Sequence, residues 1–292
     1  MPDVTVYVEA LQQRIVAHTF RRVQIRGPFL LRSVTPPLAD TEGQTVREVR
    51  RVGKRIAIGL ENDLWLVLHL MIAGRLHWRP AGKNALASFE FSSGTLQLTE
   101  AGTQHRAALH VAQGEAGLRA LDPGGLEVLD ASAADFAAVL RSENHTLKRA
   151  LADPRLFSGI GNAYSDEILH RAKMSPVALS QRLTGDQATA LFEATREVLL
   201  EWVDRLRTEA AGKFPEKVTA FRKEMAVHGR YKMDCPRCGS KIQRIRYASN
   251  ETNYCPQCQT GGKLLADRAL SRLLREDWPK TPDELDLKTS RR

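Results

Sequence analysis

The chain has 292 residues, 42% of them hydrophobic, and a formal net charge of +9 at pH 7. This length predicts two domains, or one large domain with an appendage. The longest apolar run, LWLVLHLMIAG, is interrupted by His69 and is far shorter than the roughly 20 residues of a bilayer-spanning helix. Asp3 and Glu9 stand where a signal peptide has a basic head, so we expect a cytoplasmic protein with no membrane partner.

The first half of the chain reads mainly as strands. A helix is expected first, over VTVYVEALQQRIVAHTF, despite its β-branched start. Apolar and alternating stretches then predict strands over RIAIGL, LWLVLHL and GRLHW. In SFEFSSGTLQLTE, a turn at Ser92-Ser93-Gly94 joins two alternating stretches and predicts a hairpin. The proline and the two glycines of LDPGGLEVLD then predict a domain boundary.

The second half changes to a helical period. Helices are expected over ADFAAVLRSENHTLKRALAD, AYSDEILHRAK and GDQATALFEATREVLLEWVDRLRTEA. A β-rich half followed by a helical half predicts an α+β fold with separate domains. The boundaries we expect are 1–128 for the β domain, 129–228 for the helical domain, 229–275 for a cysteine-containing appendage and 276–292 for a disordered tail.

Positive charge is concentrated near the C-terminal end. Between Lys213 and Arg275 there are 14 Lys and Arg against 5 Asp and Glu, and 14 − 5 = +9 equals the net charge of the whole chain. Such a segment attracts a polyanion, because each phosphate contact releases condensed counterions. A basic face that only keeps the protein in solution is the common alternative. A membrane surface is less favoured, because no amphipathic helix with a bulky apolar face accompanies the charge.

All four cysteines lie in CPRCGSKIQRIRYASNETNYCPQC. They form two C-x-x-C pairs, Cys235 with Cys238 and Cys255 with Cys258. Two tight turns can present four thiolates to one tetrahedral zinc ion, and the residues between the pairs suffice for a β-hairpin. Disulfides and a redox-active pair are the alternatives, and a cytoplasmic location and the matched second pair disfavour them. Four thiolates leave no open position, so we predict one structural zinc.

The segment LFSGIGNAYSDEIL places Gly159-Ile160-Gly161 between two helical stretches. Glycines permit a sharp turn there and bring backbone N–H groups close to a ligand, and the helix beginning at Asn162 favours an anion. A tight turn between two packed helices is the alternative. Together with the basic cysteine hairpin downstream, the segment predicts a second phosphate-binding element.

Over nearly its full length the chain resembles DNA glycosylases of the formamidopyrimidine/endonuclease VIII family. The resemblance lies in the Met-Pro start, in SGIGNAYSDEIL, and in the two cysteine pairs, the second of which lies in NYCPQCQ. It implies an N-terminal β-sandwich with an N-terminal helix, followed by a helix-two-turn-helix domain with a zinc-finger hairpin. It also implies excision of oxidised bases from DNA, followed by backbone cleavage through β,δ-elimination.

The resemblance also implies roles for individual residues. Pro2 would be the nucleophile, and Lys54 in RRVGKRI and Asn162 would contact phosphate. The chemistry fits proline independently of the resemblance, because a free secondary amine can attack C1′ of the sugar and form an iminium. The iminium acidifies the C2′ proton, and a nearby carboxylate must then move protons. A damaged base has to be flipped out of the stack, and side chains fill the gap.

Three departures from the family pattern affect the expected site. The family begins Pro-Glu-Leu-Pro-Glu or Pro-Glu-Gly-Pro-Glu, whereas this chain begins Pro-Asp-Val, so Asp3 is the candidate for the catalytic carboxylate. Asn250 stands where the family has its zinc-finger arginine. In HLMIAG, Ile72 takes the place of the void-filling methionine, with Met71 before it, and Arg106 in TEAGTQHRAAL is the candidate wedge.

We therefore expect a DNA glycosylase and lyase that acts as a monomer on double-stranded DNA with a damaged base or an abasic site, at the bacterial nucleoid. The rival hypothesis is a family member that binds damaged or structured DNA without cutting it, which Asp3 and Asn250 favour. A zinc-ribbon RNA-binding protein is a third hypothesis, and the helix-two-turn-helix resemblance argues against it.

Overall fold

The computed structural model describes residues 1–80, 82–101, 106–216, 222–247 and 250–265, and isolated positions after Leu265. Of the expected tail, 276–292, positions 276, 280, 282, 283, 286 and 288–292 lie outside the described residues. The chain divides into two compact units. Unit 1 comprises Met1–Gly125 and Leu200–Ala220, and unit 2 comprises Leu126–Leu199 and Phe221–Arg292. Among the described residues, no helix combines the length and the apolar character needed to cross a bilayer.

Unit 1 opens with helix α1, Pro2–Ile15. Proline fits the first helical position because no hydrogen bond is required of its nitrogen there. β-Branched residues lower the intrinsic helix propensity of this segment, but burial of one face, including Val6, Leu11 and Ile15, outweighs that cost. The helix is shorter than expected, because the chain leaves the helical region after Ile15 and enters a strand at Phe20.

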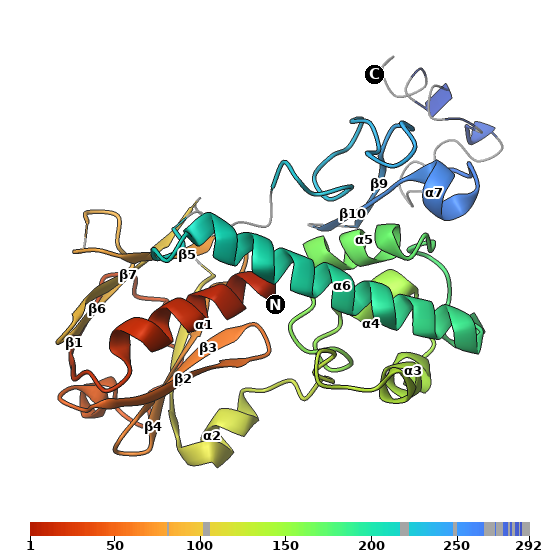
Figure 1. Ribbon diagram of the computed structural model, residues 1–292. Coiled ribbons are helices and arrows are strands. Elements are labelled where there is room, and N and C mark those ends of the chain that lie inside the picture. Colours follow the sequence, from red (N-terminus) through yellow and green to blue (C-terminus); the bar gives the residue numbers. More distant parts are fainter. Residues whose placement is uncertain are drawn as a thin grey trace. The chain divides into compact units, whose positions relative to one another are not determined.

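Unit 1 also contains two antiparallel four-stranded sheets (Figure 1). Their strand orders are β1-β6-β7-β5 and β2-β3-β4-β8. The strands are β1 (Phe20–Ile25), β2 (Val46–Val52), β3 (Arg55–Leu60), β4 (Leu64–His69), β5 (Gly74–Trp78), β6 (Ala87–Phe91), β7 (Gly94–Glu100) and β8 (Ala108–Gln113). Side chains from both sheets and from α1 share one core, and α1 packs on β2 and β3. The predicted strands and the hairpin at Ser92-Ser93-Gly94 are confirmed.

Two short helices of unit 1 were not predicted from the sequence. They are the 3₁₀ helix η1, Leu38–Thr41, and α2, Gly114–Ala120. Glycines at 114 and 117 lower the helix propensity of α2. Leu118 nevertheless anchors α2 on the outer face of the second sheet, in a cluster with Trp65 and Val67.

Unit 2 carries most of the helices. They are α3 (Ala133–Ser142), α4 (Leu147–Ala152), α5 (Asn162–Arg171), the 3₁₀ helix η2 (Ser180–Arg182), α6 (Gly185–Ala210), whose residues from Leu200 onward cluster with unit 1, and α7 (Pro256–Thr260). The stretch ADFAAVLRSENHTLKRALAD, expected to be helical throughout, is split into α3 and α4. The split is at Glu143–Thr146, where Thr146 caps the second helix by accepting from the Arg149 N–H at 3.4 Å.

A hairpin of β9, Gln243–Tyr247, and β10, Asn250–Tyr254, lies between the two cysteine pairs, as predicted. The strands pair antiparallel, with Thr252 opposite Ile245. Figure 1 shows β10 running beside α5, and the two elements are in contact. This packing places the cysteine-containing segment against the helix that follows the Gly-x-Gly turn.

Candidate functional site

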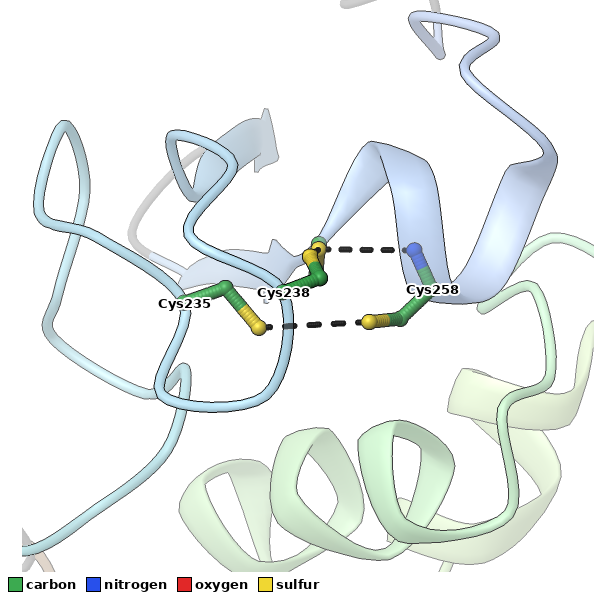
Figure 2. A group of neighbouring side chains, drawn as sticks. Cys235, Cys238 and Cys258 are labelled. Carbon is green, nitrogen blue, oxygen red and sulfur yellow. Dashed lines mark hydrogen bonds between the residues drawn. The ribbon is translucent and has the colours of Figure 1, made fainter.

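The four cysteines of unit 2 converge on one point. Their sulfur atoms all lie within 4.8 Å of one another, and Figure 2 shows Cys235, Cys238 and Cys258 directed toward each other. The Cys235–Cys258 sulfur distance is 3.9 Å and the Cys238–Cys255 distance is 3.4 Å. A tetrahedral zinc ion with Zn–S bonds of about 2.3 Å requires sulfur separations of roughly 3.8 Å. The donor set and its spacing therefore fit zinc.

One face of α5 is hydrogen-bonded to the cysteine-containing segment at intervals of four residues. At the start of α5, Asn162 Nδ2 donates to the Glu251 carbonyl oxygen at 3.0 Å. One turn later, Asp166 Oδ2 accepts from the Asn253 N–H at 3.1 Å. A further turn on, His170 Nε2 lies 3.3 Å from Cys235 Sγ. Residues four apart share one helix face, so α5 contacts the hairpin and the cysteine cluster together.

Asp166 is also the centre of a buried charge network. Its Oδ1 is 2.6 Å from Lys148 Nζ, and its Oδ2 is 2.8 Å from His228 Nδ1. Burial lowers the pKa of Lys148, and the charge of Asp166 opposes that shift. The next carboxylate, Glu167, accepts from the backbone N–H groups of residues 226–228, and burial raises its pKa. The network joins α4, α5, β10 and the chain preceding the first cysteine.

The start of α1 carries the predicted nucleophile and carboxylate. Pro2 is buried and half-buried Asp3 lies in the first turn, where a carboxylate is favoured by the helix dipole. Asp3 Oδ1 is buried, and it has no hydrogen-bond partner among the residues that the structure describes. Tyr7, one turn further on, has its pKa raised to about 12 by burial, and its hydroxyl accepts from the Leu76 N–H at 3.3 Å.

Lys54 lies in the turn between β2 and β3 and is half-buried. The preceding Gly53 has φ +58°, a conformation that favours glycine and makes the tight turn possible. Arg55 begins β3 and pairs in register with His69 of β4. Burial, followed by the charges of Arg55 and Lys54, lowers the pKa of His69 to about 4. This corner of unit 1 thus gathers cationic side chains around an uncharged imidazole.

The predicted void-filling residues lie in surface turns of unit 1. Met71 and Ile72 are in the turn between β4 and β5 and are 44% and 62% exposed. Arg106 is exposed, and its backbone N–H donates to the carboxylate of Glu100. Residues 102–105, which precede Arg106, lie outside the described part of the chain.

The predicted residues divide between the two units. Pro2, Asp3, Lys54, Met71, Ile72 and Arg106 belong to unit 1, and Asn162, Asn250 and the four cysteines belong to unit 2. Within unit 2 the structure joins Asn162 to the cysteine hairpin through Glu251. Asn250 is exposed at the first position of β10, opposite Tyr247.

Sequence reasoning missed Lys148, Asp166, His170 and His228. Asp166 and His170 lie in AYSDEILHR, which was read only as a helix. The signal for them was an acidic residue and a histidine spaced four and eight residues after Asn162, on one helix face. His228, seven residues before Cys235, had no sequence pattern that could connect it to Asp166.

Three family models match the chain. Residues 1–116 match the N-terminal domain of formamidopyrimidine-DNA glycosylase, 124–211 match its H2TH domain, and 235–261 match the zinc finger found in FPG and IleRS. The zinc-finger match and the cysteine cluster together assign one structural zinc ion to the four thiolates. The fold, with its N-terminal helix, antiparallel sheets, helical region and zinc-finger hairpin, is the α+β architecture that the sequence predicts.

Relatives match over most of the chain. The formamidopyrimidine-DNA glycosylase of Heliobacterium modesticaldum is 31% identical, over 89% of this chain and 99% of that protein. A formamidopyrimidine-DNA glycosylase-like protein of Mycobacterium tuberculosis is 44% identical, over 54% of this chain and 96% of that protein. The crystal structure of the MutM (FPG) protein from Thermus thermophilus is 29% identical, with a TM-score of 0.76, over 89% and 98% of the two chains. The chain therefore belongs to the formamidopyrimidine-DNA glycosylase family.

Proposed function

We propose that this DNA glycosylase removes oxidised bases from duplex DNA and then cleaves the backbone as a lyase, with Pro2 as nucleophile. The observation that carries the proposal is the start of α1, where Pro2 is followed by Asp3, whose buried Oδ1 has no hydrogen-bond partner in the described part of the chain. A small second residue such as proline permits removal of Met1 and frees a secondary amine. The unperturbed pKa of an α-amino group is about 8, so a useful fraction is uncharged at neutral pH.

The reaction proceeds through a covalent bond between Pro2 and the sugar. The proline nitrogen attacks C1′ and the damaged base departs with its bonding electrons and a proton. Ring opening then gives an iminium, which acidifies the C2′ proton. Loss of that proton expels the 3′ phosphate, and a second elimination expels the 5′ phosphate. In this scheme Asp3 carries protons to and from the sugar.

We assign the remaining residues to holding the distorted duplex. Asn162 and Lys54 contact phosphates beside the flipped nucleotide, and Met71, Ile72 and Arg106 occupy the space that the base leaves. In this assignment residues 1–128 carry the chemistry, 129–228 bind the backbone, and the zinc hairpin within 229–275 adds a further phosphate contact.

A complex of one solved relative supports this class of substrate. The Lactococcus lactis enzyme has been solved with DNA containing Fapy-dG, at 25% identity to this chain and a TM-score of 0.77. We expect this chain to act likewise on damaged and abasic duplex DNA, as a monomer at the nucleoid.

A family member that binds damaged DNA without cutting it is the second candidate. The observation that favours it is Asn250, which is exposed and uncharged at the position where the family has an arginine. A contact between a neutral amide and a phosphate stabilises a DNA complex less than a contact between an arginine and a phosphate. The start Pro-Asp-Val, in which a carboxylate shorter by one methylene follows the proline, points the same way.

Borohydride trapping on duplex DNA with one abasic site separates the two candidates. In protein whose Met1 is shown by mass spectrometry to be removed, we expect a covalent adduct that maps to Pro2. Pro2→Gly should lessen the adduct, and Asp3→Asn should slow strand cleavage more than trapping. Asp186→Asn is the matched control, because Asp186 is also in the first turn of a helix, α6. Binding of the duplex with no adduct would favour the non-cutting candidate.

A further inference from the structure

The side chain of His170 contacts a zinc ligand from outside the coordination sphere. His170 is 4% exposed at the end of α5, and its Nε2 is 3.3 Å from Cys235 Sγ. It is not a member of the group of ligand atoms that lie within 4.8 Å of one another, which contains only the four cysteines among the described residues. Four thiolates complete a tetrahedral shell, so His170 has no role as a ligand.

Zinc binding decides whether His170 Nε2 or Cys235 Sγ donates the hydrogen bond. A zinc-bound cysteine is a thiolate, which has lost its proton and can only accept a hydrogen bond. The hydrogen of the contact must therefore come from the imidazole, which fixes His170 as the tautomer protonated on Nε2. Four thiolates at −1 and one Zn²⁺ leave a formal charge of −2, and an N–H donor to sulfur stabilises that charge.

The backbone of His170 is held as well as its ring. The Arg237 guanidinium, from the first C-x-x-C turn, donates to the His170 carbonyl oxygen at 2.7 Å. The first cysteine pair is thus bound to α5 twice, once through the ring of His170 and once through its carbonyl. These contacts lie within unit 2 and orient the imidazole toward the sulfur.

The second cysteine pair has its own connection to the same end of α5. Gln259 accepts from the Cys255 N–H at 2.8 Å and donates to the Met174 carbonyl oxygen at 2.9 Å. Both C-x-x-C turns are therefore fastened to the chain at residues 170–174. Of these contacts with residues 170–174, the one made by the His170 ring reaches a cysteine sulfur directly.

We propose that His170 is a positioning residue of the zinc centre, whose Nε2–H donates to the Cys235 thiolate and holds the metal-bound turn on α5. The proposal concerns the metal site alone and stands whether or not the chain cleaves DNA. Because Asn162 lies on the same face of α5 two turns earlier, the helix that begins at the predicted phosphate contact ends on a zinc ligand. Loss of this hydrogen bond should weaken zinc binding before it alters the rest of the fold.

Zinc release tests the proposal in the intact protein. We expect His170→Phe, which keeps an aromatic ring but lacks the donor, to release zinc to an excess of chelator about 10- to 100-fold faster than the parent. His170→Gln, whose amide can donate, should restore much of the loss. Thr195→Val is the control, because it removes a buried hydroxyl bonded only to Leu191 of its own helix among the described residues. Equal release from His170→Phe and the parent, or from the Phe and Gln variants, would overturn the proposal.

A second measurement needs no substitution. Long-range ¹H–¹⁵N spectra of the zinc-loaded parent report which imidazole nitrogen carries the proton. We expect His170 to carry it on Nε2 and to show no exchange with the other tautomer. A proton on Nδ1 alone would leave Nε2 unable to donate to a thiolate, and it would refute the proposal even if every variant failed to fold.

Discussion

At the scale of single residues, His69 shows how neighbouring charge and burial set a protonation state. His69 pairs in register with Arg55 on the neighbouring strand, and burial together with the charges of Arg55 and Lys54 lowers its pKa to about 4. The imidazole is therefore uncharged at pH 7, and one nitrogen can donate while the other accepts. The charge of this corner comes from the arginine and the lysine.

His69 should remain neutral until the solution is distinctly acidic. In an NMR titration its Cε1–H resonance should move near pH 4, against about 6.5 in the unfolded chain. Because the folded pKa is the lower one, the stabilisation from neutral His69 is present above pH 6.5 and is lost as the pH falls toward 4. His69→Gln should therefore lose less stability than the parent between pH 7 and pH 4, by urea unfolding. A midpoint near 6.5 in the folded protein would contradict this account.

Asn162 offers a residue-scale test of DNA binding. Its amide nitrogen is held by the Glu251 carbonyl, which fixes the side chain at the start of α5. We expect Asn162→Ala to weaken binding of abasic duplex about tenfold, the loss of one or two hydrogen bonds, without changing the preference among lesions. Asn144→Ala, at an exposed position between α3 and α4, is the control. Parent-like affinity of Asn162→Ala in fluorescence anisotropy would remove Asn162 from the interface.

At the scale of elements, periodicity was sufficient where a long amphipathic pattern was uninterrupted. The predicted segment GDQATALFEATREVLLEWVDRLRTEA is α6 from end to end. The split between α3 and α4 was not predicted, because the apolar period continues across it. The local signal was Thr146, whose hydroxyl caps α4, and a tertiary bridge to Leu179 fixes the break. The spacing of apolar residues along the sequence carries no information about such a tertiary contact.

The same limit applies to the candidate site. Cysteine spacing alone predicted the zinc cluster, because two short turns bring the thiolates together by local geometry. The partners of Asp166 could not be predicted in this way. Lys148 and His228 come from segments 18 residues before it and 62 residues after it, and only the packed fold brings them to one carboxylate.

The cap at Thr146 can be measured directly. We expect Thr146→Ala to lower the free energy of unfolding by about 1 kcal/mol, because the Arg149 N–H loses its acceptor at the helix start. Ser142→Ala makes a comparable change in the last turn of α3, where the hydroxyl donates to Val139 and alanine favours the helix. Urea unfolding should show the loss for Thr146→Ala and little change for Ser142→Ala. Equal effects would show that the cap does not contribute.

At the scale of the whole molecule, the net charge of +9 is equalled by the segment from Lys213 to Arg275. If this segment contacts about five phosphates, the slope of log affinity against log salt concentration on duplex DNA should be about −4 to −5. Replacing both Lys241 and Arg246, which are exposed around the zinc hairpin, with Gln should make the slope shallower by up to about 2. A slope near zero for the parent would show that the basic segment does not bind nucleic acid.

Unit 1 is built from two segments that are far apart in the sequence, and this affects how it folds during synthesis on the ribosome. Its core includes Leu206 and Phe214, and the Phe214 ring lies 5.7 Å from that of Tyr7 in α1. Arg207 also forms an ion pair with Glu9 of α1 at 2.7 Å. The roughly 90 residues between Gly125 and Phe214 take roughly 4 to 18 s to translate at about 5–20 residues per second. During that interval the nascent α1 lacks part of its packing surface, so unit 1 cannot finish folding until the first segment of unit 2, Leu126–Leu199, has also emerged.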